Sequence, residues 1–97
     1  MLNVYAAFGR DHVAFSLDSD EMNNRSVEYD FRSDLDFDNR YTVLSRLGDH
    51  PDSAPMDALL QRVMDNAVDT HNMTNSDILE CTIALTDDEV YLVNRHG

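Results

Sequence analysis

The feature that most constrains the fold is an apolar pattern between residues 56 and 68. Apolar residues recur there every three or four positions: Met56, Leu59, Leu60, Val63, Met64, Ala67 and Val68. This spacing predicts an amphipathic α-helix, with Pro55 in its first turn, Ser53 or Ala54 as its N-cap and the polar segment 70–76 after its end. Because such a helix must bury its apolar face, the remaining segments are expected to supply a surface for it.

Alternation of apolar and polar residues, which is typical of half-buried strands, occurs in the first third and near the end of the chain. The strands that it predicts cover residues 2–8, 13–17, 27–31, 79–85 and 90–93. Gly9-Arg10-Asp11 is expected to turn the first hairpin, and Thr86-Asp87-Asp88-Glu89 the last one.

In the middle of the chain, Tyr41, Leu44 and Leu47 are spaced as on one helical face, which predicts a second, short helix. Asp38 suits its N-cap and Gly48 its C-terminal end. The predicted fold class is therefore α+β: a single compact acidic domain over 1–97, with an antiparallel sheet, the order βββ-αα-ββ along the chain and two helices packed on one face.

The charge of the chain indicates its kind of partner. The formal net charge is −12, fifteen of the nineteen acids are aspartate, and there is no lysine beside the seven arginines. A field of this sign repels nucleic acid and anionic membranes and favours a protein with a basic groove. No apolar run reaches the roughly 18–20 residues that cross a bilayer, the first residues lack a signal-peptide pattern, and Cys81 has no second cysteine to pair with. We therefore expect a complete, monomeric cytoplasmic protein that binds neither nucleic acid nor a membrane directly.

The acids are concentrated between residues 18 and 38, a segment that contains eight acids and only two arginines. Along a strand, alternate acids repeat about every 6.6–6.8 Å, and along the predicted long helix the i, i+4 ridge repeats about every 6 Å. Both spacings are close to those of phosphates along a nucleic-acid strand. The candidate partner-binding residues are Asp18, Asp20, Glu21, Asp30, Asp34, Asp36, Asp38, Asp57, Asp65 and Asp69.

The sequence offers little for catalysis, and we expect no catalytic residue, no cofactor and no metal. Asp34, Asp36 and Asp38 match the first three ligand positions of a calcium loop, but Asn39 and Ser45 fail at its glycine and bidentate glutamate positions. Cys81 lies on the apolar face of a predicted strand and is expected to be buried. The histidines show no metal-ligand spacing and are expected to be solvated; they are His12, His50, His71 and His96.

In its length, its lack of lysine and its excess of aspartate, the whole chain resembles the phage-encoded DNA mimics, most of all the small anti-CRISPR proteins that act on type I-F surveillance complexes. The resemblance implies a non-enzymatic inhibitor that occupies the basic channel where such a complex grips target DNA. Tyr29, Phe37 or Tyr41 would anchor the complex as aromatic neighbours of the acids. Three alternatives remain: an immunity protein or antitoxin that neutralises one basic nuclease, a salt-adapted acidic housekeeping domain, and an enzyme with a cofactor that the sequence does not reveal.

Overall fold

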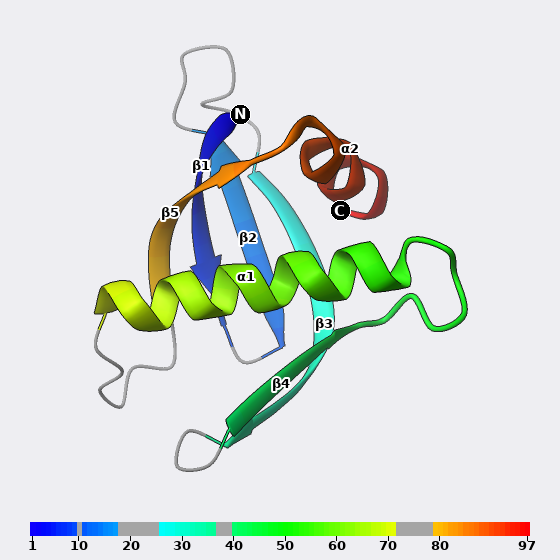
Figure 1. Ribbon diagram of the computed structural model, residues 1–97, viewed down its shortest axis with the longest axis horizontal. Coiled ribbons are helices and arrows are strands. Elements are labelled where there is room, and N and C mark those ends of the chain that lie inside the picture. Colours follow the sequence, from blue (N-terminus) through cyan, green and yellow to red (C-terminus); the bar gives the residue numbers. More distant parts are fainter. Residues whose placement is uncertain (10, 18–25, 37–39, 72–78) are drawn as a thin grey trace.

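The computed structural model describes residues 1–9, 11–17, 26–36, 40–71 and 79–97. Five strands and two helices follow one another along these segments (Figure 1). In chain order they are β1 (Leu2–Phe8), β2 (His12–Leu17), β3 (Ser26–Asp36), β4 (Arg40–Ser45), α1 (Ser53–His71), β5 (Leu79–Leu85) and α2 (Asp87–His96). No helix in these segments is both long and apolar enough to cross a membrane.

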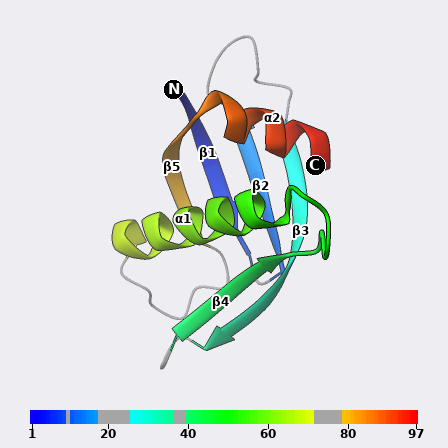
Figure 2. The same cartoon turned by 45° about the vertical axis from the view of Figure 1, so that its right-hand side comes forward.

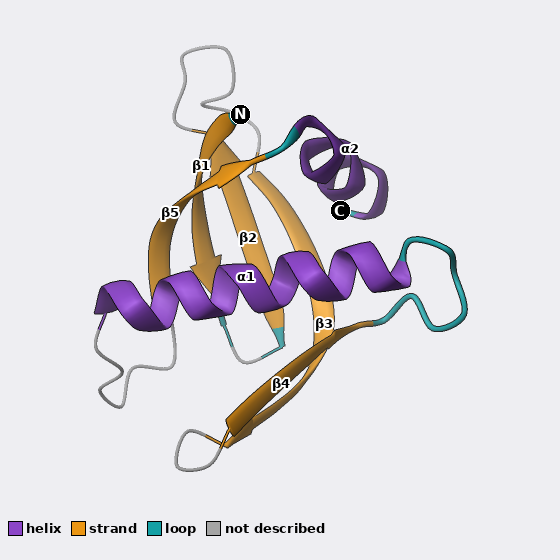
Figure 3. Ribbon diagram, in the orientation of Figure 1, coloured by secondary structure: helices purple, strands orange, loops and turns teal. Residues whose placement is uncertain are grey.

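The strands form one antiparallel sheet in the order β4-β3-β2-β1-β5. The long strand β3 changes neighbour along its length: residues 26–30 pair with β2 and residues 31–36 pair with β4. The β3–β4 hairpin therefore bends away from the rest of the sheet (Figure 2). Both helices lie on the same side of the sheet, with α1 running across the strands (Figure 3). The predicted class, an antiparallel α+β fold with two helices on one face, is confirmed.

The core lies between the helices and the inner face of the sheet. Along each strand every second described residue is buried or partly buried, as the alternation predicts, and the rings of Phe8 and Phe31 lie 4.6 Å apart between centroids. The long helix begins at Ser53, and its described apolar face is fully buried. The buried residues that α1 contributes are Met56, Leu59, Leu60, Val63, Met64 and Ala67.

The short helix predicted over residues 41–47 is wrong, because this segment is strand β4. Val43 and Ser45 are buried while Leu44, which the helical spacing placed in the core, is 41% exposed. The β-branched and aromatic composition of Tyr41-Thr42-Val43 favours a strand, and the second half of β3 provides a partner for it. Gly48 does adopt a left-handed conformation (φ 61°), but in the turn that follows a strand. The predicted N-cap, Asp38, lies outside the described residues.

The last predicted strand, residues 90–93, is also wrong, because it belongs to helix α2. Thr86 caps this helix: its hydroxyl accepts a hydrogen bond from the backbone N–H of Glu89, whose carboxylate accepts one from the backbone N–H of Thr86. This capping box starts a helix where a turn was predicted. Three acids in the first turn and two basic residues in the last turn also stabilise α2, because their charges interact favourably with the helix dipole. The order of elements is therefore βββ-β-α-β-α.

Candidate interaction surface

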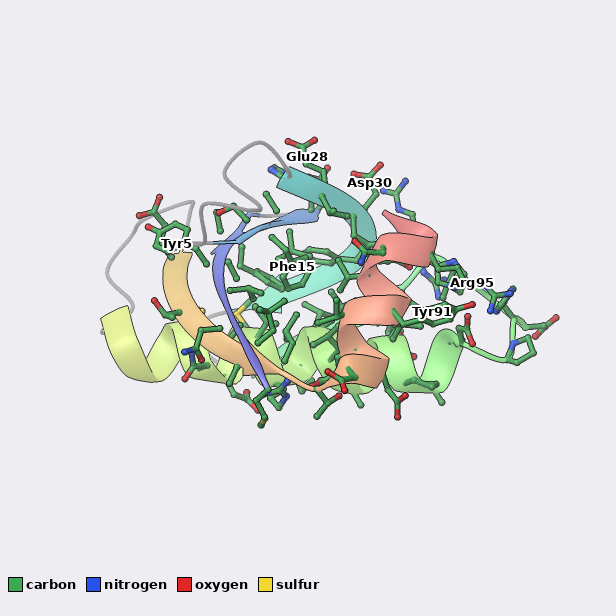
Figure 4. All side chains as sticks on the ribbon, turned by 90° about the horizontal axis from the view of Figure 1, so that it is seen from above. Tyr5, Phe15, Glu28, Asp30, Tyr91 and Arg95 are labelled. Atoms are coloured by element: carbon green, nitrogen blue, oxygen red, sulfur yellow. The ribbon has the colours of Figure 1, made fainter. Side chains whose placement is uncertain are left out.

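No helix or strand of the described segments covers the face of the sheet opposite the helices. In Figure 4, Tyr5, Glu28 and Asp30 project from this side, whereas Phe15 points toward the helices. We call it the open face, and its described side chains that are classed as exposed are Asn3, Tyr5, His12, Glu28, Asp30, Arg32, Thr42, Leu44, Glu80 and Thr82.

The strand register fixes the spacing of the carboxylates on the open face. Glu80 is paired with Ala7, Ala7 with Ala14, and Ala14 with Glu28, so these four residues form one row across β5, β1, β2 and β3. Three strand spacings separate the two glutamate backbones by about 14 Å. Asp30 follows Glu28 on the same face and lies opposite His12. Two small alanines thus lie between the acids at the two ends of the row.

Tyr5 and Glu80 are linked on the open face. The Tyr5 hydroxyl donates a hydrogen bond of 2.6 Å to Oε2 of Glu80, and this bond to a carboxylate is the main cause that raises the pKa of Tyr5. The pair joins β5 to β1 and restricts where the Glu80 carboxylate can point.

The predicted acids fall into different layers of the fold. Asp30 is exposed on the open face, whereas Asp57 and Asp65 lie on α1, which covers the opposite face. Asp34 and Asp36 lie in β3, paired with Thr42 and Arg40 of β4, and Asp69 lies in the last turns of α1, all three described by backbone position only. The structure therefore does not bring the strand acids and the helix ridge into one surface. Four other candidates lie outside the described residues: Asp18, Asp20, Glu21 and Asp38.

Three residues proposed for the interface, Asp57, Tyr29 and Asp65, have internal partners. Oδ1 of the half-buried Asp57 accepts a hydrogen bond of 2.5 Å from the backbone N–H of Ser45, which ties α1 to β4. Tyr29 is only 5% exposed, and its hydroxyl accepts a bond of 3.2 Å from the backbone N–H of Arg46. The prediction of Tyr29 as an aromatic anchor is therefore wrong, because its ring belongs to the core. Phe37 lies outside the described residues, and only the backbone of Tyr41 is described. On α1, Asp65 is exposed and accepts a bond from Gln61.

Two arginines are used within the fold. Arg62 binds Oε1 of Glu89 at 2.5 Å and donates to the carbonyl oxygen of Ala84 at 3.0 Å, which covers part of the free edge of β5. Partial burial acts to raise the pKa of Glu89, but the bonds from Arg62 and Thr86 outweigh it and lower that pKa overall. Arg95 lies 3.5 Å from Oδ2 of Asp52.

Five exposed acids, in contrast, form no ion pair or side-chain hydrogen bond with any residue in the described segments. They are Glu28, Asp30, Asp49, Asp87 and Asp88. None of them lies within ion-pair distance of an arginine in the described segments, and the arginine nearest to Asp30 along β3 is Arg32, two residues away on the same face.

A second cluster, which the sequence did not predict, joins His50, Asp52 and His96. Nε2 of His96 lies 2.7 Å from Oδ2 of Asp52, and Nδ1 of His50 lies 3.8 Å from the same oxygen. The bond to His96 is the largest cause that lowers the pKa of Asp52, and Arg95 adds to it. The expectation of a solvated His96 is wrong, since its side chain is 12% exposed. His50 and Asp52 are close together in the sequence, but the third member of the cluster, His96, is 44 residues away from Asp52.

Cys81 is buried in β5, as predicted, where burial raises the pKa of its thiol.

Comparisons of the chain with protein-family models, with curated proteins and with solved structures found no match. The function is therefore inferred from the chemistry of the surface itself.

Proposed function

We propose that the protein is a non-enzymatic inhibitor that places its acidic surface in the basic DNA-binding channel of a bacterial defence complex and so blocks target DNA. In keeping with the resemblance to phage DNA mimics, the proposed target is a type I-F CRISPR surveillance complex in the host cytoplasm. The observation that supports the proposal is the set of exposed acids without cationic partners in the described segments, while Arg62 and Arg95 bind other acids of the fold.

The strand geometry suits this function. Glu28 and Asp30 are two residues apart on one face of β3, which separates them by about 6.6–6.8 Å. This equals the advance of two nucleotides along one strand of B-DNA, about 6.8 Å. Strand β3 is paired on one side or the other along its length, so the carboxylates are held in place before binding and lose little freedom when they dock.

Each carboxylate would take the place of a phosphate and accept hydrogen bonds from an arginine or lysine of the channel. Long-range attraction between the net charge of −12 and a basic channel would make association fast and sensitive to salt. Inhibition is therefore expected to weaken when the salt concentration is raised from about 50 to 200 mM, because screening shortens the range of the attraction.

A competition gel shift tests the proposal. The protein is titrated into a purified type I-F surveillance complex before labelled target duplex is added. One variant carries Asp30→Asn, Asp34→Asn and Asp36→Asn in β3. A matched control with the same change in charge carries Asp11→Asn, Asp49→Asn and Asp87→Asn. We expect the wild type and the control to abolish the shifted band near stoichiometric amounts, and the β3 variant to need at least about tenfold more protein.

Two results would contradict the proposal in different ways. A band that persists at tenfold excess of wild-type protein would exclude this complex as the target. Equal weakening in the β3 variant and the control would show that net charge alone matters, and would exclude an ordered array on β3. A stable one-to-one complex with a single basic nuclease would instead identify an immunity protein.

A further inference from the structure

Three side chains with metal-binding atoms meet between the start of α1 and the end of α2. His50 lies in the loop after β4, Asp52 directly precedes α1, and His96 ends α2. One donor atom from each lies within 4.8 Å of the other two. Figures 1 and 2 both show the C-terminal end of α2 close to the loop that leads into α1.

Two of the three distances between donor atoms are close to those around a small ion, and the third, between His50 and His96, is at most 4.8 Å. Zinc binds imidazole nitrogen at about 2.0–2.1 Å and carboxylate oxygen at about 2.0–2.2 Å, which separates two ligands of a tetrahedral site by about 3.3 Å. The observed separations from Oδ2 of Asp52, 2.7 Å to His96 and 3.8 Å to His50, lie on either side of this value. An ion would therefore need shifts of less than about 1 Å in each of these two pairs.

Two imidazoles and one carboxylate are a donor set used for zinc and related divalent transition metals. We propose that His50, Asp52 and His96 bind one zinc-type divalent ion, with water in the remaining position, and that this ion fastens the end of α2 to the start of α1. A pocket of about 330 Å³, lined by Asp52, Pro55 and Tyr91 among others, opens beside Asp52.

The hydrogen bonds of the cluster define what the ion replaces. Nδ1 of His50 accepts a bond of 3.0 Å from the backbone N–H of Asp52, so its lone pair is directed toward Asp52. When the ion binds, this lone pair is donated to the ion and the hydrogen bond from the backbone N–H of Asp52 is given up. Between His96 and Asp52 the ion takes the place of the hydrogen bond that joins Nε2 and Oδ2, so that Nε2 offers its lone pair to the ion and the neutral ring carries its proton on Nδ1.

Arg95 is the residue that opposes the ion. Its guanidinium lies 3.5 Å from Oδ2 of Asp52 and its side chain is 50% exposed, so it can turn into solvent when the ion enters. The C-terminal end of α2 partly offsets this repulsion, because the helix dipole favours a cation there. Removing the charge of Arg95 is therefore expected to strengthen metal binding.

Calorimetric titration of the metal-free full chain with zinc chloride tests the site, and visible absorption with Co²⁺ reports the geometry. We expect one ion per chain. His50→Ala and His96→Ala should each weaken binding by at least about 10–100-fold, the usual effect of removing even an outer-shell partner. Arg95→Gln should strengthen it by about 10–30-fold, the effect of one unit charge some 4–6 Å from a divalent ion in a water-like dielectric.

The chain supplies a matched control, since His12 and Asp11 also form an exposed histidine–aspartate pair, at 3.2 Å. His12→Ala should bind zinc like the wild type. The proposal is overturned if the wild type takes up no ion, if His12→Ala weakens binding as much as His50→Ala does, or if Arg95→Gln leaves the affinity unchanged. Far-UV circular dichroism of each metal-free variant separates loss of a ligand from loss of folding. These variants change none of the acids on β3, so this result is independent of the gel shift.

Discussion

Replacing Glu89 with alanine tests the way in which α2 is held. Oε1 of this carboxylate accepts hydrogen bonds from the backbone N–H of Thr86 at 2.9 Å and from Nη2 of Arg62 at 2.5 Å. Arg62 in turn holds the carbonyl of Ala84 at the edge of β5. Glu89→Ala therefore removes half of the capping box, the ion pair to α1 and one negative charge from the first turn of α2.

The size of the effect follows from these three losses. A helix cap contributes about 1 kcal/mol, a partly exposed ion pair about 0.2–1 kcal/mol, and a charge near a helix N-terminus about 0.3–1 kcal/mol. Their sum, about 2 kcal/mol, is the expected loss in the free energy of unfolding. In a domain of this size, a loss of 1 kcal/mol lowers Tm by about 4–8 °C, so Glu89→Ala is expected to lower Tm by about 8–16 °C.

Urea and thermal unfolding followed by far-UV circular dichroism measure the loss. The matched control is Asp88→Ala, since Asp88 is an exposed acid of the same helical turn without an ion pair in the described segments. It should cost less than about 1 kcal/mol, because only the dipole interaction is lost. If Glu89→Ala and Asp88→Ala differ by less than about 0.5 kcal/mol, within the usual scatter of surface substitutions, the bonds to Thr86 and Arg62 do not stabilise α2 and the reasoning is refuted.

Three further predictions concern other parts of the chain. Gly48→Ala should lower the free energy of unfolding by about 1 kcal/mol in a denaturant titration, because φ is +61° and the site is otherwise open, whereas Gly48→Asn should cost less. The thiol of Cys81 should react with a disulfide reagent only when the protein unfolds, since burial raises its pKa; rapid reaction of the native protein would contradict this. In the folded protein the pKa of Glu89 lies below its ordinary value of 4.5. The ionised carboxylate therefore stabilises the fold at a pH above 4.5, and this stabilisation is lost as the pH falls through the lowered pKa. The stability difference between wild type and Glu89→Gln should therefore shrink in acid and stay constant between pH 6 and about 8.

Local patterns predicted the elements whose signals agree with one another. β1, β2, β5 and α1 each show one clear periodicity, and the structure contains all four. In residues 40–47, Leu44 and Leu47 suggested a helix while Val43 and the β-branched neighbours favoured a strand. Pairing with the second half of β3 decides between them, and that contact is not local. Helix α2 differs, because its capping signature Thr86-x-x-Glu89 is present in the sequence and competes with a short apolar run that also suits a strand.

The acidic surface could be predicted only as a total charge, because the partners of several acids come from distant parts of the chain. Asp57 receives the N–H of Ser45, Asp52 binds His96 and Glu89 binds Arg62. In the sequence these acids look no different from Asp30, which is exposed on the open face. Acids that hold the fold together are poor candidates for a partner, since docking would have to break an internal bond that already stabilises them. Of the predicted acids, Asp30 is therefore the described one best placed to meet a basic groove, with Glu28, which was not among them, beside it on β3.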